Sequence, residues 1–358
     1  MIDRRVYRER LPELRRRSER YRSEFLDREL GLSNIALITE SPRGRVLSAD
    51  SASGRIILKF FLGRRVPVAR LAACVQHAYG KRGIDVPEIV FSDLTQSVEV
   101  EYGIGCIATR FIDGTALRRG DARQESRAFQ NLAEIHRVVP VEVTSLELPG
   151  ISIDADGRPL RLGRLRNFER QYRCDVAEIR EFLQGPLRGL RAADVQRVEN
   201  WRDEAEARMQ EFGLARVVLH GDYHSNNLVF ASDSAPYAID FENACVGPFR
   251  AELGAALLRM LYGANSWKLD RFDLDRLLDE PRLRTAEEAY FSVAPERSRD
   301  FWAKHREAAL LSAYLWTVWR CSHRAQRAYR YSFARRMRYR VQAFERWKRF
   351  LHHLNRGS

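Results

Sequence analysis

The feature that most constrains this chain of 358 residues is a polar loop, residues 220–227, between two short apolar runs. The loop reads HGDYHSNN, and the runs before and after it, VVL and LVF, have the composition of short buried strands. Asp222 and Asn227 are therefore expected on one tight loop, and a third short strand follows that ends at Asp240. Two carboxylates and one amide at the ends of adjacent strands can converge on a single point.

This set of oxygen-bearing side chains suits phosphoryl transfer, in which the protein contributes mainly positioning and electrostatic stabilisation. One carboxylate accepts the hydrogen bond of the substrate hydroxyl and orients it. The second carboxylate and the amide oxygen hold magnesium, which prefers hard oxygen ligands and neutralises charge on the transferring phosphate. The loop therefore predicts a magnesium-dependent phosphotransferase.

The loop form HGD-x-H-x-x-N resembles the catalytic loop of the kinase-like superfamily, in its aminoglycoside phosphotransferase and choline kinase branch. Residues 239–242 (IDFE) resemble the metal-binding motif of that branch. Residues 246–248 (VGP) and 252–254 (ELG) resemble its downstream tail, where an aspartate commonly occupies the place of Glu252. Two upstream segments are also similar to the family: residues 132–136 (LAEIH) and residues 111–114 (FIDG). The resemblance covers roughly residues 31–270.

The resemblance implies a role for each matching residue. Asp222 would be the catalytic residue that orients the acceptor hydroxyl, and Asn227 and Asp240 would be the magnesium ligands. His220 and His224 would be supporting members of the loop. The resemblance further implies ATP as the phosphate donor and an alcohol group as the acceptor.

The pattern of the whole chain favours an α+β, two-lobed protein kinase-like fold, with a small antiparallel β lobe and a larger, mainly helical lobe. Residues 1–30 predict a charged helix that Gly31 ends, residues 31–112 a β-rich nucleotide-binding lobe, and residues 113–358 the helical lobe. The strands expected in the small lobe are 35–39, 46–49, 55–61, 88–91, 98–102 and 106–111, with a helix over 68–79. In the large lobe we expect helices over 128–138, 166–184 and 192–212, a loop over 140–165, the catalytic loop 220–227, the metal motif 240–242, and basic aromatic helices over about 300–354.

Three residues of the small lobe are candidates for binding the nucleotide. Lys59 ends an apolar strand, where a lysine can pair with the α- and β-phosphates of ATP. Ser41 and Gly44 precede it, close to where the glycine-rich loop of a kinase would lie. The expected helix 68–79 contains no acidic residue to pair with that lysine, and Gln76 is its only obvious polar substitute. This missing glutamate motivates an alternative, a catalytically degenerate kinase-fold protein that binds nucleotide or a partner without turnover.

The charge of the chain bears on the acceptor. Its formal net charge is +13, from 61 Lys and Arg against 48 Asp and Glu. Such a field favours anionic partners and repels polycations. We therefore expect a small-molecule or glycolipid acceptor that is neutral or anionic, such as a sugar, with an antibiotic phosphotransferase of the aminoglycoside type as the alternative.

Residues 314–354 interleave aromatic residues with arginines and admit two interpretations. They can form terminal helices that pack onto the large lobe, or an interfacial helix that rests on an anionic membrane. No recognised nucleic-acid-binding module is present, so nucleic acid is not expected as a partner. There is no apolar run of about 18 residues and no apolar signal region, which predicts a cytoplasmic protein, with the inner face of a membrane as its peripheral contact.

Overall fold

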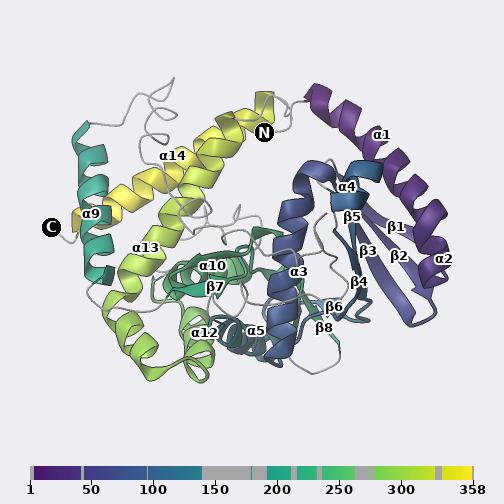
Figure 1. Ribbon diagram of the computed structural model, residues 1–358. Helices are drawn as coiled ribbons and strands as arrows, with labels where there is room; N and C mark the ends of the chain where they lie inside the picture. Colours follow the sequence, from purple (N-terminus) through teal and green to yellow (C-terminus); the bar gives the residue numbers. More distant parts are fainter. Residues whose placement is uncertain are drawn as a thin grey trace.

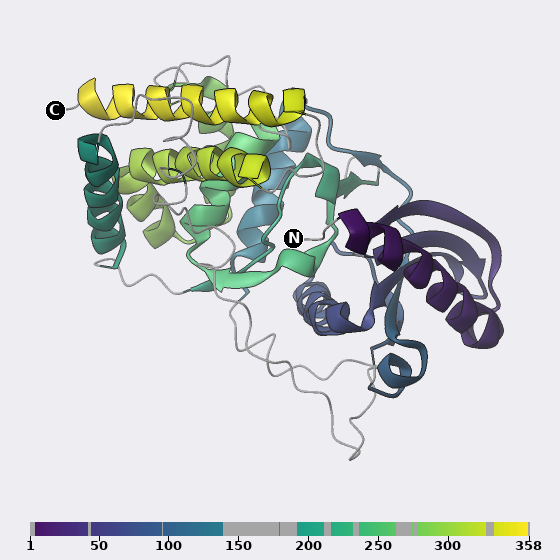
Figure 2. The same ribbon diagram turned by 90° about the horizontal axis from the view of Figure 1, so that it is seen from above.

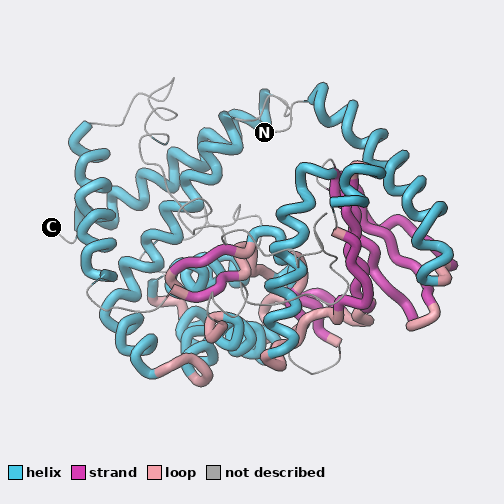
Figure 3. The backbone as a smooth tube through the Cα atoms, viewed as in Figure 1, coloured by secondary structure: helices cyan, strands magenta, loops and turns pink. Residues whose placement is uncertain are grey.

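The computed structural model describes residues 4–41, 44–94, 96–138, 192–210, 216–231, 236–262, 278–326 and 333–356, and residues 179 and 274. The chain forms a small lobe and a large lobe side by side (Figure 1). The long strands gather in the small lobe, whereas helices dominate the large one, which has short strands (Figure 3). This division agrees with the predicted α+β, two-lobed architecture.

The small lobe is built on a five-stranded antiparallel sheet in the order β1-β2-β3-β5-β4. The strands are β1 (Ser33–Ser41), β2 (Gly44–Ser51), β3 (Gly54–Leu62), β4 (Ile89–Asp93) and β5 (Ile104–Arg110). Strand β3 is central, and Lys59 on it lies opposite Val46 of β2 and Ile107 of β5. Side chains alternate along β3, so this lysine points away from the face that buries Leu58 and Phe60.

The N-terminal helices cover that buried face of the sheet. Helix α1 (Arg4–Tyr21) continues through a π-helical turn, Arg22–Leu26, into α2 (Asp27–Leu30). Gly31 follows with a φ of 61°, a left-handed conformation that glycine adopts without steric cost. The helices bury Leu14, Tyr21 and Leu26 against Leu47, Ile56, Leu58 and Phe60 of the sheet.

Helix α3 (Val66–Lys81) packs on the opposite face and joins the two lobes. It follows a 3-10 turn, Gly63–Arg65, and near its start Ala69 and Ala73 contact the sheet residue Ile107. Toward its end, Tyr79 belongs to the core of the large lobe, where its hydroxyl donates a hydrogen bond of 3.3 Å to the carbonyl of Val218.

The strand predicted over 98–102 is wrong, because these residues belong to helix α4 (Gln96–Tyr102). The alternating sequence VEVEY has the period of a strand, but Val98 and Tyr102 are also four residues apart. One helical face therefore carries both side chains against the small-lobe core. Gly103, with a φ of 66°, follows the helix before β5 begins.

The large lobe surrounds one extended hydrophobic core. Within the described residues its helices, besides the two C-terminal ones treated below, are α5 (Ala122–Ile135), α9 (Ala192–Gln210), α10 (Phe249–Tyr262) and α12 (Pro281–Phe291). Its short strands are β6 (Thr115–Ala116), β7 (Val217–Leu219), β8 (Leu228–Phe230), β9 (Tyr237–Ala238) and β10 (Cys245–Gly247). They form a two-stranded sheet, β10-β7, and a three-stranded sheet, β6-β8-β9. The loop predicted over 140–165 and the helix predicted over 166–184 lie outside the described residues, apart from residue 179.

The two C-terminal helices, α13 (Glu296–Gln326) and α14 (Phe333–Arg356), pack against each other, and α13 also packs against α10 (Figures 1 and 2). The aromatic side chains that they bury include Tyr314, Trp316, Tyr339, Trp347 and Phe350. These side chains support the packing interpretation of residues 314–354. Within the described ranges, no helix is long and apolar enough to span a bilayer.

Helices α10 and α13 approach closely at Gly254. A Cβ atom at this position would lie 3.1 Å from the carbonyl oxygen of Ala309 and 3.2 Å from the Cβ of Ala313. Glycine at this position therefore sets the spacing between α10 and α13. This spacing in turn sets the position of α10 relative to the loop 220–227, described next.

Candidate active site

A cleft of about 1000 Å³ opens between the lobes. Six of the predicted site residues line it. They are Ser41, Gly44 and Lys59 from the small lobe, and Asp222, Asn227 and Asp240 from the large lobe. The other two, His220 and His224, belong to the same loop, but their side chains are buried.

The first turn of the loop depends on Gly221 and Glu252. Gly221 has a φ of 80°, and a Cβ atom there would clash with the backbone of Asn243. The carboxylate of Glu252, on α10, accepts hydrogen bonds from the backbone N–H groups of His220 at 2.9 Å and of Gly221 at 2.6 Å. A buried carboxylate thus fixes two consecutive amides of the loop. A hydrogen bond to an ionised acceptor is stronger than one between neutral groups.

Two buried side chains hold that carboxylate in turn. The imidazole Nε2 of His136 lies 3.0 Å from a Glu252 oxygen, and the Tyr290 hydroxyl lies 2.7 Å from His136 Nδ1. A neutral imidazole that donates from Nε2 and accepts at Nδ1 satisfies both bonds. Burial raises the pKa of Glu252, but the hydrogen bonds from His136 and from the N–H of Gly221 outweigh burial and lower it. The residue is therefore a carboxylate at neutral pH.

His220 connects the loop to the metal motif. Its Nε2 lies 3.0 Å from the carbonyl of Ile239, and its Nδ1 accepts a bond of 3.3 Å from the N–H of Asp222. Its ring also packs on Phe241, with 4.7 Å between centroids, and Phe241 contacts Tyr79 of α3. Burial lowers the pKa of His220, which favours its neutral form.

Asp222 is held between a cation and a histidine. Arg259 Nη2, on α10, lies 2.6 Å from Asp222 Oδ1, and His224 Nε2 lies 3.5 Å from Oδ2. Burial raises the pKa of Asp222, but the His224 hydrogen bond and the Arg259 charge outweigh it and hold this pKa well below its usual range. The carboxylate is ionised throughout the neutral range, and His224 is oriented because its Nδ1 accepts a bond of 3.2 Å from the N–H of Asn226.

Lys59 has two acidic partners in the large lobe. Its Nζ lies 2.8 Å from Asp240 Oδ1 and also pairs with Glu242, which pairs in addition with Arg65. Burial lowers the pKa of Lys59, but these two carboxylates outweigh it and raise it. Gln76, considered above as a substitute partner, instead donates a hydrogen bond of 2.6 Å to the carbonyl of Pro87. The lysine therefore takes its acidic partners from the metal motif rather than from α3.

The oxygen donors of the cleft fit a magnesium ion. The amide Nδ2 of Asn227 donates a bond of 3.0 Å to the carbonyl of Asp222, which leaves its Oδ1 as an acceptor. Among the described residues, the hydrogen bonds and ion pairs of Asp240 use only Oδ1, so its second oxygen is open to a cation. Burial raises the pKa of Asp240, but the charge of Lys59 outweighs it and lowers it. Hard oxygens at adjacent positions are the donors that this ion prefers.

Sequence reasoning missed Arg259 and Glu242. Arg259 lies seven residues after Glu252, two helical turns along the same face of α10, so both side chains reach the loop. That spacing was visible in the sequence, but its significance depends on where α10 lies. Glu242 was visible in the motif IDFE, yet nothing local indicates that it faces Lys59.

Comparison with known proteins bears on the family and the fold. A family model described as "Phosphotransferase enzyme family" matches residues 40–301 of the chain. A search of curated proteins finds no match.

Solved structures of three proteins share the fold at low sequence identity. A putative aminoglycoside phosphotransferase from Ralstonia eutropha has a TM-score of 0.54 at 14% identity, over 94% of this chain and 97% of the other. A macrolide 2′-phosphotransferase from Brachybacterium faecium has a TM-score of 0.53 at 14% identity, over 90% and 97%. An ethanolamine kinase from Plasmodium vivax has a TM-score of 0.51 at 12% identity, over 87% and 82%. The predicted kinase-like fold is confirmed.

Proposed function

Because this chain belongs to the phosphotransferase enzyme family, we propose that it transfers the γ-phosphate of ATP to a hydroxyl group of a small molecule, with magnesium as the cofactor. The observation that carries this proposal is the convergence of Asp222, Asn227 and Asp240 on one cleft that also contains Lys59. The cleft is lined by oxygen donors suited to a divalent cation, by a cation suited to phosphates, and by the ionised carboxylate of Asp222.

In this proposal each residue has one task. Lys59, Ser41 and Gly44 bind the phosphates of the nucleotide from the small lobe. Asp222 accepts the hydrogen bond of the acceptor hydroxyl and aims its oxygen at the γ-phosphorus. Asn227 and Asp240 would hold the magnesium, which supplies positive charge against the phosphate oxygens when bound.

The environment of Asp222 indicates that it acts mainly by orientation. A carboxylate whose pKa lies well below its usual range is a weak base, so it gains little from taking the proton early. Such a residue fits a loose transition state, in which the hydroxyl proton leaves late and positioning dominates. Arg259 fixes Oδ1, and Oδ2, which His224 contacts at 3.5 Å, keeps a lone pair for the hydrogen bond of the acceptor hydroxyl.

The acceptor class follows from charge. We propose a neutral or anionic acceptor, such as a sugar or glycolipid headgroup, because the chain carries +13 overall. The acidic side chains that line the cleft are Asp222, Asp240 and Glu242, and each already has a cationic partner. A polycationic antibiotic would compete with those partners. Its phosphorylation is the second candidate to test.

The experiment measures magnesium-dependent ADP release from ATP across a panel of sugars, glycolipid headgroups, amino alcohols and aminoglycosides. The wild-type chain is compared with Asp222→Ala and with Asp279→Ala, a change at an exposed carboxylate in a pair of 3.5 Å with Arg284. We expect transfer by the wild type and the control, and a loss of at least about a hundredfold in Asp222→Ala, as for removal of other positioned catalytic groups.

Two results would count against the proposal. Absence of magnesium-dependent ATP binding by the wild type would refute it outright. Binding of ATP without transfer to any hydroxyl, and with no change in Asp222→Ala, would favour a nucleotide-binding protein without turnover.

A further inference from the structure

Helix α1 ends before residue 40, where the match to the family model begins, yet it is integrated into the small lobe. Its buried residues Leu14 and Tyr21 belong to the same core as the sheet. The Tyr21 hydroxyl donates a hydrogen bond to Asp93 at the end of β4. This helix is therefore held on the sheet at several points along its length.

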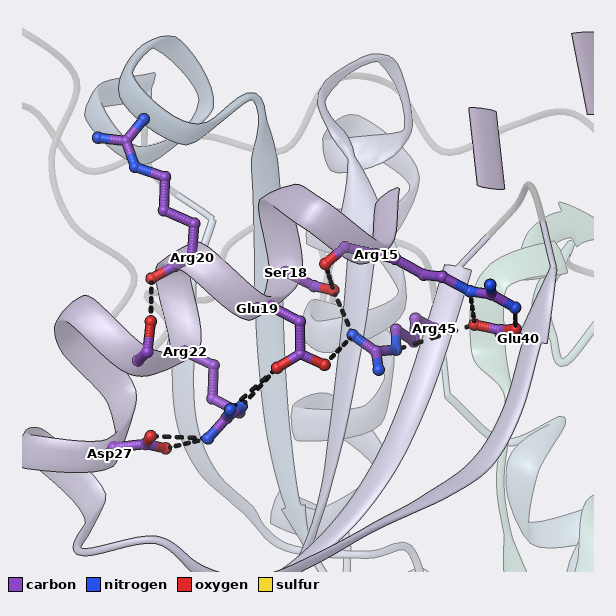
Figure 4. Close-up of polar contacts among 9 residues, drawn as sticks. Arg15, Ser18, Glu19, Arg20, Arg22, Asp27, Glu40 and Arg45 are labelled. Atoms are coloured by element: carbon purple, nitrogen blue, oxygen red, sulfur yellow. Dashed lines mark hydrogen bonds and ion pairs between the residues drawn. The ribbon is translucent and has the colours of Figure 1, made fainter. Parts of the chain in front are cut away.

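Polar contacts fix α1 to the strands on both sides of the nucleotide-binding turn (Figure 4). On β1, Glu40 pairs with Arg15 of the helix. On β2, Arg45 Nη1 lies 2.9 Å from Ser18 Oγ and 2.6 Å from Glu19 Oε1. Glu40 and Arg45 are next to Ser41 and Gly44, so the helix is fixed to the two strand ends beside the residues that we propose to contact the phosphates.

Arg10, one and a half turns before Arg15 on α1, lines the interlobe cleft together with Ser41 and Gly44. In both Figure 1 and Figure 2 the N-terminal end of α1 is the end nearer the large lobe. A cationic side chain from outside the matched family region thus enters the cleft beside the turn.

The other cations that line the cleft already have acidic partners. Lys59 pairs with Asp240 and Glu242, Arg65 pairs with Glu242, and Arg110 pairs with Glu88. Within the part of the chain that the structure describes, Arg10 has no ion pair or hydrogen bond of its side chain. Among the described cations of the cleft lining, Arg10 is therefore the one that can bind a ligand without first giving up an acidic partner, and it would act beside Lys59.

We propose that Arg10 binds the phosphate chain of the nucleotide, so that α1 completes a phosphate site that begins with Ser41 and Gly44. This inference rests on the proposed function, because it takes a nucleoside triphosphate as the ligand of this cleft. A guanidinium suits the task, since its planar array of N–H donors matches phosphate oxygens and its charge strengthens each bond.

The test is calorimetric titration of the full chain with ATP, ADP and adenosine in the presence of magnesium. The variants are Arg10→Ala and Arg10→Lys, with Arg28→Ala as the matched control, because Arg28 is a 76% exposed arginine on α2. We expect Arg10→Ala to weaken ATP binding about tenfold, Arg10→Lys to restore part of it, and adenosine binding to stay unchanged. Thermal unfolding of each variant shows that the helix remains on the sheet.

The outcomes separate this inference from the proposed function. If the wild type binds ATP and Arg10→Ala binds it equally well, the role of Arg10 is refuted and the proposed function stands. If Arg10→Ala weakens adenosine as much as ATP, the residue shapes the cleft and does not bind phosphate, which also refutes the inference. A wild type that binds no ATP overturns both.

Discussion

Replacement of Arg259 by methionine tests the central electrostatic feature of the site. Arg259 is buried, and its Nη2 lies 2.6 Å from Asp222 Oδ1. Two unit charges about 4 Å apart attract by about 4 kcal/mol at an effective dielectric constant of about 20. The Asp222 side chain retains 25% exposure, so water offsets part of this attraction. We expect a net coupling of about 1–3 kcal/mol.

A double-mutant cycle isolates that coupling. The free energies of unfolding of the wild type, Arg259→Met, Asp222→Asn and the double variant are measured by urea denaturation at pH 7. The control cycle uses Arg284→Met and Asp279→Asn, an exposed pair at 3.5 Å for which we expect at most about 0.5 kcal/mol. A coupling between Arg259 and Asp222 no larger than that of the control pair would refute the reasoning.

The difference in free energy of unfolding between the wild type and Arg259→Met should depend on pH with a definite sign. The lowered pKa of Asp222 stabilises the folded state above the unfolded pKa of aspartate, about 3.9, and this contribution is lost as pH falls below that value. Methionine at position 259 removes the charge that lowers the pKa. The difference in free energy of unfolding between the wild type and Arg259→Met should therefore be largest at neutral pH and shrink as pH falls through about 4.

Three further changes test the scaffold of the cleft. Gly221→Ala should destabilise the fold by at least about 2 kcal/mol, because the new Cβ would clash with the backbone and the φ is positive. The control Gly120→Ala also has a positive φ, but its Cβ would meet open space, so it should cost about 1 kcal/mol. Urea denaturation measures both free energies of unfolding. Glu252→Gln should cost about 1–3 kcal/mol by leaving a loop amide without a charged acceptor, and equal stability by the same assay would contradict this role. Lys59→Met should raise the KM for ATP at least about tenfold in a coupled ADP assay, and an unchanged KM would exclude its phosphate contact.

Much of the site could be predicted because its signal is local in the sequence. The loop 220–227 and Asp240 stand between short apolar runs, so their positions at strand ends follow from the pattern alone. Local turns then place the residues, as Gly221 shows by its backbone conformation. Their roles in catalysis stay predictions.

The partners of these residues could not be predicted, because they come from distant parts of the chain. Lys59 and Asp240 are separated by 181 positions, and Asp222 and Arg259 by 37. Only the placement of α3 and α10 brings these charges together. The absence of an acid from helix α3 therefore gave a misleading expectation about Lys59, whose partners lie in the other lobe.

The incorrect strand over 98–102 has a different cause. A spacing of four residues satisfies both the period of a strand and the repeat of a helix. Val98 and Tyr102 are compatible with either structure, and packing against the core decides between them. In such segments, packing against neighbouring residues decides between helix and strand, and the pattern of the segment itself does not.

The spacing of α10 and α13 has a consequence for where harmful substitutions would arise. Helix α10 carries both Glu252, which holds the backbone of the loop, and Arg259, which holds the carboxylate of Asp222. Gly254, between them, is the point where α13 approaches. A larger side chain at position 254 would shift the loop backbone held by Glu252 and the carboxylate of Asp222 together, by tenths of an ångström. Genetic screens should therefore recover loss of activity from sites on α13 that touch neither substrate nor metal.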